Sequence, residues 1–128
     1  MKVDLWTPSG GFTLEPNAFT AATDTAGHRL LIAGPGAGKT EVLAQRADFL
    51  LRTGQCPYPR RILAIAFKTD AASNLRQRVA DRCGRDLASR LDSYTFHGFA
   101  KRLIDSYRVV LTGDDALDPD FQVGPTRI

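Results

Sequence analysis

The sequence predicts an α/β fold in which a parallel sheet is flanked by helices. Short apolar runs typical of buried strands alternate along the chain with amphipathic segments of helical period. A glycine-rich turn separates the first of these runs from the helix that follows it. The chain has 128 residues, 43% of them hydrophobic, which suffices for one domain with a core. Strands and helices that alternate in this way form βαβ units with right-handed crossovers.

The first third of the chain predicts an irregular lead-in, a short helix and a buried strand. Residues 1–13 contain Pro8 and neighbouring glycines, and we interpret them as the lead-in. An Ala/Thr-rich helix is expected from about residue 14 to 26, with Pro16 near its first turn. The apolar run 29–33 is bounded by glycines, as a buried parallel strand would be.

The middle third predicts a helix, a strand and a second helix. After Lys39, apolar residues recur at three- and four-residue spacing as far as Gly54, a suitable C-terminal cap. Residues 62–67 form a second apolar run, and a helix is expected over about 70–83. Its arginines are expected to point mostly outward: Arg76, Arg78, Arg82 and Arg85.

The last third predicts a third strand, a long helix and a tail. Residues 91–95 are short enough for the strand, and apolar residues on one side of 96–110 indicate the helix. The acidic residues 111–128 are interpreted as a loop or linker. The folded domain is therefore expected to span residues 14–110.

Composition excludes several classes of protein. Ordinary apolar and charged fractions argue against a disordered tail, a collagen-like fibre and a disulfide scaffold. The apolar runs are too short for a transmembrane helix, and the N-terminus lacks a signal-peptide stretch. Cys56 and Cys83 lie far apart without a Cys-x-x-Cys pair, so we expect neither a zinc site nor a disulfide. These features favour a cytoplasmic protein with no membrane partner.

The positive charge is concentrated in the middle of the chain. The whole chain carries a formal net charge of +3, but residues 60–108 alone hold eleven basic and five acidic side chains. Such a segment could attract a polyanion, and it could equally form solvated helix faces. Charge alone leaves both interpretations open.

The segment 33–40, Ala-Gly-Pro-Gly-Ala-Gly-Lys-Thr, matches the phosphate-binding (Walker A) loop with Ala for its first Gly. Glycines let successive N–H groups converge on a phosphate, and the helix N-terminus adds its positive dipole end. Lys39 would reach the β- and γ-phosphates, and the Thr40 hydroxyl would hold Mg²⁺, so both are the expected catalytic residues. The alternative is a glycine-rich turn with an incidental lysine. The expected nucleotide-binding residues are Gly34, Pro35, Gly36, Ala37, Gly38, Lys39, Thr40 and Glu41.

Hydrolysis of a nucleotide also requires carboxylates, and the candidates in this sequence are poor. Asp70 lies just beyond a strand end but starts a helix, while Asp114 and Asp115 follow a helix and a glycine. Each is better explained as a helix cap or a linker charge than as the magnesium ligand. We expect the catalytic carboxylates to be absent from this chain.

Three segments in this order resemble one family, the UvrD/Rep-like superfamily 1 DNA helicases. Residues 30–40 are similar to the family's Ala-Gly-x-Gly-Ser-Gly-Lys-Thr loop. Residues 62–72 resemble motif Ia, and Thr-Phe-His-Gly-Phe-Ala at 95–100 resembles motif Ib. The resemblance covers about residues 14–108. It implies a P-loop NTPase (RecA-like) domain, present in part, that uses ATP and Mg²⁺, binds single-stranded DNA and works with the remaining helicase domains.

The resemblance also assigns DNA-binding positions. Phe67 would stack on a base or support the groove, although a residue at a strand end can simply belong to the core. Lys68 and Thr69 would lie by the DNA backbone. Thr95 and His97 would face the strand, although His97 can equally be a helix-start residue bonded to the backbone. Aromatic platforms with nearby cations hold single strands without sequence preference.

The sequence departs from the family's pattern at several positions. The family's adenine-reading Gln falls on Ala18, motif Ia's Asn-Lys is Thr69-Asp70, and Glu41 replaces a frequent Arg. The later motifs and the second motor domain have no counterpart.

We interpret the chain as the N-terminal part of the first motor domain of a 3′–5′ DNA helicase, inactive on its own. Two alternatives remain at this stage. One is a small P-loop phosphotransferase, and the other is a non-catalytic module that binds single-stranded nucleic acid.

Overall fold

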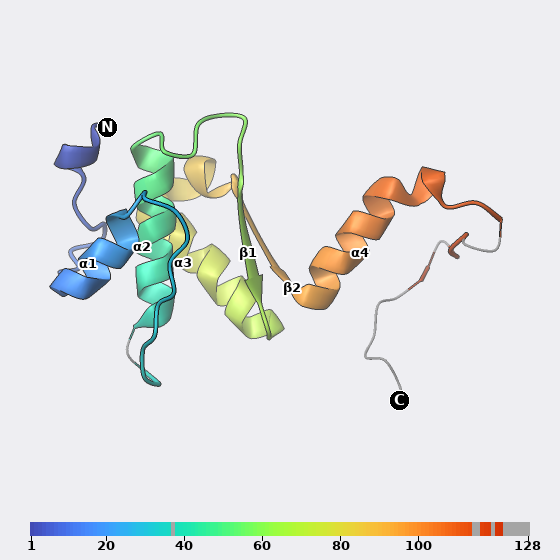
Figure 1. Cartoon of the computed structure of the whole chain (residues 1–128), viewed down its shortest axis with the longest axis horizontal. Helices are drawn as coiled ribbons and strands as arrows, with labels where there is room; N and C mark the ends of the chain where they lie inside the picture. Colours follow the sequence, from blue (N-terminus) through green and yellow to red (C-terminus); the bar gives the residue numbers. More distant parts are fainter. Residues whose placement is uncertain (37, 114–115, 119, 122–128) are drawn as a thin grey trace.

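The computed structural model describes residues 1–36, 38–113, 116–118 and 120–121. Helices α1, α2 and α3 gather on one side of two strands, and α4 extends away on the other (Figure 1). In chain order the elements are η1 (Val3–Leu5), α1 (Pro16–Thr23), α2 (Lys39–Arg52), β1 (Ile62–Ala66), α3 (Thr69–Ala88), β2 (Leu91–Thr95), α4 (Phe96–Tyr107) and η2 (Arg108–Val110).

The sheet consists of β1 and β2, which run parallel. Ile62 lies opposite Leu91, and Ala66 lies opposite Thr95. Helix α3 makes the crossover between them, as parallel pairing requires. The α/β class and the strands predicted at 62–67 and 91–95 are confirmed, and the carboxyl ends of both strands meet at one edge.

The prediction of a strand at residues 29–33 is wrong. This segment has no regular secondary structure, and Leu30 and Ile32 are both 84% exposed. The two strands of the sheet pair with each other, and within the described ranges no third strand runs beside this segment. A lone extended segment has no ladder hydrogen bonds to hold it, so its apolar sequence is not sufficient.

The predicted helices are present, with shifted ends. The first is shorter than expected, and the helix predicted over 70–83 continues to Ala88. Gly84 changes the direction of α3, because its φ of 82° and ψ of 161° are not helical. The last helix ends at Tyr107 and continues as η2. In the part of the chain that is described, no helix has the length and apolarity needed to cross a membrane.

The core has two clusters, one on each side of α2. The first joins α2, α3 and β2 through Ala44, Ala47, Leu75, Val79, Ala88 and Leu91. The second joins Trp6, Ala22 and Phe49, with the Trp6 and Phe49 ring centroids 5.4 Å apart. The lead-in therefore contributes a buried tryptophan to the core.

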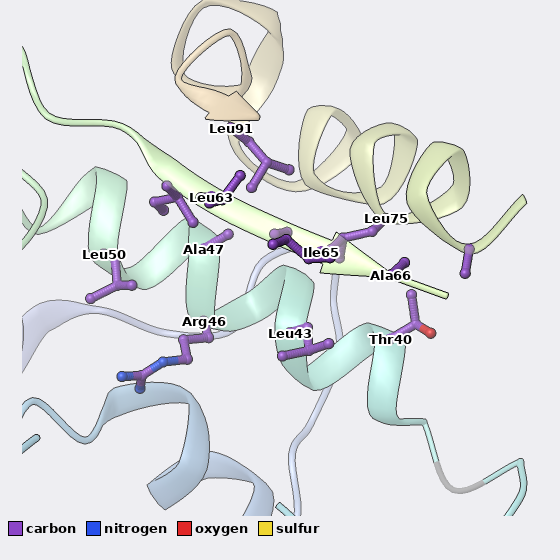
Figure 2. Close-up of a pocket in the computed structure, with 13 residues that line it drawn as sticks. Thr40, Leu43, Arg46, Ala47, Leu50, Leu63, Ile65, Ala66, Leu75 and Leu91 are labelled. Carbon is purple, nitrogen blue, oxygen red and sulfur yellow. The ribbon is translucent and has the colours of Figure 1, made fainter. Parts of the chain in front are cut away.

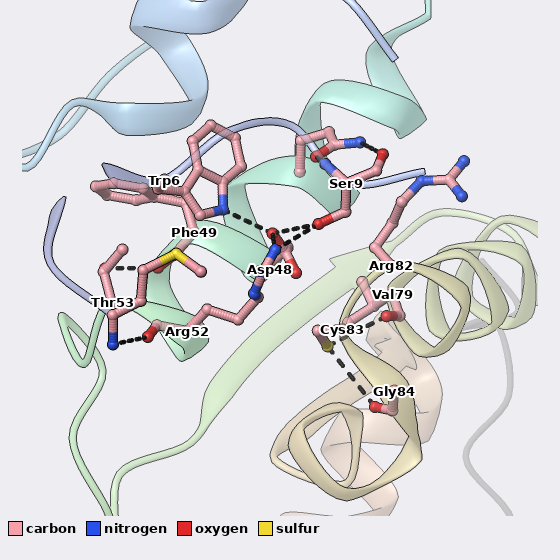
Figure 3. A network of polar contacts seen from close by, with 12 residues as sticks. Trp6, Ser9, Asp48, Phe49, Arg52, Thr53, Val79, Arg82, Cys83 and Gly84 are labelled. Atoms are coloured by element: carbon pink, nitrogen blue, oxygen red, sulfur yellow. Dashed lines mark hydrogen bonds and ion pairs between the residues drawn. The ribbon is translucent and has the colours of Figure 1, made fainter. Parts of the chain in front are cut away.

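A buried carboxylate fixes the lead-in to α2 (Figure 3). Asp48 is fully buried and accepts hydrogen bonds from Trp6 Nε1 at 2.7 Å and from Ser9 Oγ at 2.9 Å. Arg52, one turn further along α2, lies 3.3 Å from the same carboxylate oxygen. Burial of this charge is possible because polar partners and an arginine compensate for the lost water.

An apolar cavity of about 360 Å³ lies between α2 and β1 (Figure 2). Leu43 and Leu50 line it from α2, and Leu63 and Ile65 line it from β1. Thr40 and Ala66 border the same cavity. The start of α2 and the carboxyl end of β1 therefore lie at the same end of the molecule.

Candidate phosphate-binding loop and strand-end surface

The glycine-rich loop ends where α2 begins. Gly36 and Gly38 have φ angles of 74° and 73°, in the left-handed region that glycine adopts without a Cβ clash. Helix α2 starts at Lys39, and the first N–H groups of any α-helix have no intrahelical acceptor. These donors, together with the positive end of the helix dipole, form a site suited to an anion. Ala37, predicted to bind nucleotide, lies outside the described residues.

The Lys39 ammonium lies against the loop itself. Its Nζ donates to the carbonyl oxygens of Ala33 at 2.9 Å and Gly34 at 2.8 Å. An ammonium has three donors, so these two contacts hold the side chain while leaving it able to meet an anion. The side chain predicted to contact phosphate is therefore folded over the loop that would bind it.

A hollow of about 270 Å³ opens beside the loop. It is smaller than the roughly 300–1,000 Å³ typical of whole small-molecule sites, so its size suits a chain of phosphates better than a complete nucleotide. Its lining residues are Gly36, Gly38, Lys39, Thr40, Glu41 and Arg78.

Glu41 is committed to ion pairs with α3. Arg82 donates to both carboxylate oxygens, from Nε at 2.9 Å and from a terminal nitrogen at 3.0 Å. Arg78 and Gln45 add bonds of 3.0 and 2.8 Å. These partners, Arg82 first, lower the pKa of Glu41 to about 2, so the group is ionised at neutral pH. A contact between Glu41 and a nucleotide would come from its backbone N–H.

Arg82 departs from the outward orientation expected for the arginines of α3. Its side chain is only 14% exposed, whereas that of Arg78 is 40% exposed. The bidentate pair with Glu41 holds Arg82 between α2 and α3. Sequence analysis missed both arginine contacts because the partners lie about forty residues apart in the chain.

The metal prediction rests on Thr40 alone. Asp70 is exposed in the first turn of α3, and Asp114 and Asp115 lie outside the described residues. Where the structure describes the chain, no group of three His, Cys, Asp or Glu side chains could hold a metal ion. Thr40 borders the hollow beside the loop, which is where a cation bound to phosphates would need a ligand.

The carboxyl ends of β1 and β2 present an aromatic pair. Phe67 is 90% exposed and Phe96 is 57% exposed, with ring centroids 6.0 Å apart and planes at 73°. Helices α3 and α4 begin within three residues of these strand ends, so two positive helix ends lie at the same edge. Lys68, also exposed, lies between β1 and α3. We call Phe67, Lys68, Phe96 and His97 the strand-end surface.

The other predicted DNA-binding residues lie at this edge with different surroundings. Thr69 is exposed as the first residue of α3, and His97 is exposed in the first turn of α4. Thr95 caps α4, because its hydroxyl oxygen accepts a hydrogen bond from Gly98 N at 3.1 Å. Sequence analysis missed Phe96, although it stands inside the Thr-Phe-His segment. Its exposure and its ring partner appear only in three dimensions.

Comparison with known proteins gives a consistent result. A family model described as the UvrD/REP helicase N-terminal domain matches residues 14–124. The chain is 39% identical over 84 residues to the ATP-dependent DNA helicase PcrA of Leuconostoc citreum, which covers 66% of this chain and 11% of the relative. It is 35% identical over 94 residues to DNA helicase II of Escherichia coli, covering 73% of this chain and 12% of the relative.

A third relative extends the match over most of the chain. The ATP-dependent DNA helicase UvrD1 of Mycobacterium leprae is 32% identical over 110 residues, which covers 86% of this chain and 14% of that protein. The chain thus spans between 11% and 14% of the length of these three relatives.

Proposed function

The chain belongs to the UvrD/REP helicase family, and from that premise we propose that it is the ATP- and DNA-binding N-terminal segment of an ATP-dependent 3′–5′ DNA helicase. The observation that carries the proposal is the arrangement at one end of the molecule. There, a glycine-rich loop opens a helix, and exposed aromatic rings lie at two parallel strand ends. The first feature suits a phosphate chain and the second suits unpaired bases.

The nucleotide role rests on Lys39, Thr40 and the loop N–H groups. When bound, Mg²⁺–ATP would supply free energy through hydrolysis of its terminal phosphoanhydride bond by water. Lys39 would compensate the phosphate charge, and the Thr40 hydroxyl would ligate the cation. A phosphate chain needs N–H donors and a positive charge. Both are present here, since the hollow lies beside Lys39 and the N-terminus of α2.

The DNA role rests on the strand-end surface. Exposed aromatic rings such as Phe67 and Phe96 offer bases a stacking platform, and Lys68 supplies a cation for the backbone. The basic excess of residues 60–108 adds a sequence-independent attraction for phosphate.

The isolated chain is expected to turn over no ATP. Rapid phosphoryl transfer needs a carboxylate-held cation, an oriented water and a cation on the transferring phosphate. The chain spans a small part of its relatives, so we assign translocation and unwinding to a complete protein together with its remaining domains. ATP hydrolysis stimulated by DNA in the purified 128-residue chain would contradict this expectation. Hydrolysis that is independent of DNA would favour the phosphotransferase.

Nucleotide binding can be tested by titrating the chain with a fluorescent ATP analogue in Mg²⁺ buffer. Lys39→Ala is expected to weaken binding about tenfold or more, because a charge-assisted contact to phosphate is lost. Lys2→Ala removes the same charge from an exposed site far from the loop and should change binding little. Equal affinities for the two variants would argue against the loop as the site. Binding of DNA without any binding of nucleotide would favour the non-catalytic module.

DNA binding can be tested by fluorescence anisotropy with a labelled oligothymidine. Phe67→Ala is expected to weaken binding, since stacking is worth about 1–3 kcal/mol per base. Tyr58→Ala is the matched control, because this ring is 86% exposed but precedes the other end of β1. If the affinity for the oligothymidine falls equally in both variants, the strand-end surface is not the DNA-binding site.

A further inference from the structure

The hollow beside the loop is lined by one side chain from outside the loop segment. Gly36, Gly38, Lys39, Thr40 and Glu41 follow one another along the chain, whereas Arg78 comes from the third turn of α3. Arg78 therefore borders the same hollow as Lys39, although 37 residues separate it from its partner Glu41. Neither the loop motif nor the charge pattern points to Arg78.

The charges around Glu41 leave Arg78 partly uncompensated. One carboxylate serves two guanidinium groups. Arg82 takes both carboxylate oxygens and is nearly buried, so it accounts for most of that negative charge. Arg78 makes a single bond of 3.0 Å to one oxygen and is 40% exposed. The remaining positive charge thus lies on the arginine that borders the hollow.

Arg78 also has donors to spare. A guanidinium carries five N–H groups in a planar fork, and only one Arg78 nitrogen bonds to Glu41. Its Nε is buried and, among the described residues, has no hydrogen-bond partner, so the donors that can meet a ligand are the remaining N–H groups of the two terminal nitrogens. Phosphate oxygens are the acceptors that a guanidinium fork binds in bidentate fashion.

We propose that Arg78 is a second phosphate-binding cation, which contacts the outer phosphates of a nucleotide held by the loop, while the Glu41–Arg82 pair keeps it in place. This inference rests on the proposed nucleotide binding and extends it to a residue of α3. Helix α3 begins at the strand-end surface, so a phosphate contact to Arg78 would join the nucleotide directly to the helix that leads from the DNA-binding edge.

The experiment is a comparison of ATP, ADP and AMP binding by isothermal titration with the whole 128-residue chain. Arg78→Gln is expected to weaken ATP binding about tenfold or more and to leave AMP binding within about twofold, because AMP lacks the outer phosphates. Arg85→Gln is the matched control: it removes the same charge from an exposed position on the same helix. It should change the affinity for all three nucleotides by less than about twofold.

The outcomes separate this inference from the function on which it rests. If Lys39→Ala weakens ATP binding and Arg78→Gln behaves as Arg85→Gln does, the role of Arg78 is overturned and the nucleotide site stands. If the unaltered chain binds none of the three nucleotides at millimolar concentration, both proposals are overturned.

A second variant covers the case in which Arg78→Gln disturbs the fold, which circular dichroism would reveal. Arg78→Lys keeps the charge and can keep the pair with Glu41, but it loses the planar fork. It is expected to weaken ATP binding several-fold. Unchanged ATP affinity in a folded Arg78→Lys chain would overturn bidentate binding by this residue.

Discussion

In most proteins apolar side chains are buried and charged ones are exposed. Two regions of this chain show the opposite: the interface between α2 and α3, and the segment 29–33. At this interface Glu41 is buried against α3, and on the same helix α2 Gln45 and Asp48 are buried against the lead-in and are completely inaccessible. The segment contains four consecutive apolar residues, yet Leu30 and Ile32 are among the most exposed large hydrophobic side chains in the described part of the chain. The difference shows that burial follows the availability of partners. Carboxylates with arginine and tryptophan partners are buried, and a strand without a neighbour stays exposed.

The largest expected effect tests this difference directly. Phe49 is completely buried against Trp6, and Phe49→Ala should lower the free energy of unfolding by about 3–5 kcal/mol. Leu30→Ala, which also truncates a large apolar side chain, should change it by no more than about 0.5 kcal/mol. Urea denaturation of both variants provides the measurement. Comparable losses would mean that the segment is buried in solution.

An intermediate effect is expected from pH. The folded-state pKa of Glu41 is about 2, below its ordinary value of 4.5, because of Arg82, Gln45 and Arg78. The ion pairs therefore stabilise the fold fully above pH 4.5, and this stability is lost as the pH falls toward 2. The contribution is on the order of 2 kcal/mol after solvent screening.

Acid denaturation of Glu41→Gln checks this expectation. The difference in stability between the unaltered chain and this variant should be large at pH 7 and shrink between pH 4.5 and 2. Asp105→Asn removes a carboxylate from an exposed pair with Lys101 and should show almost no such difference. A pH-independent gap for Glu41→Gln would mean that packing, and not charge, makes the α2–α3 interface stable.

The smallest effect is expected at a surface pair with the same geometry. Arg61 donates to both oxygens of Asp92 at 2.6 and 2.9 Å, as Arg82 does to Glu41, but its side chain is 49% exposed. Arg61→Ala should therefore destabilise the chain less than Phe49→Ala or Glu41→Gln does. Added salt should remove this loss of stability. If Arg61→Ala in high salt lowers the free energy of unfolding as much as Glu41→Gln does, burial does not distinguish the Arg61–Asp92 pair from the Arg82–Glu41 pair.

Sequence patterns predicted the helices and strands whose formation depends on the spacing of neighbouring residues. The start of α2 at Lys39, β1 and β2 each follow from neighbouring residues, and the structure confirms them. The strand expected at 29–33 failed because a strand also needs a partner that no local pattern supplies. Sequence analysis missed Arg78 and Phe96 for the same reason, since their contacts are with Glu41 and Phe67, more than twenty-five residues away in the chain.

The parallel pairing of β1 and β2 determines how the chain can reach this fold. The two strands cannot meet as a local hairpin, because the chain must first cross the sheet through Thr69–Ala88. Sheet and crossover helix must therefore form together, and such non-local pairing is slow. During synthesis, Ile62–Ala66 can pair with Leu91–Thr95 only after that second strand has left the ribosome. An apolar strand that waits for its partner is prone to non-native association, so this interval is the one in which the chain is most exposed to misfolding.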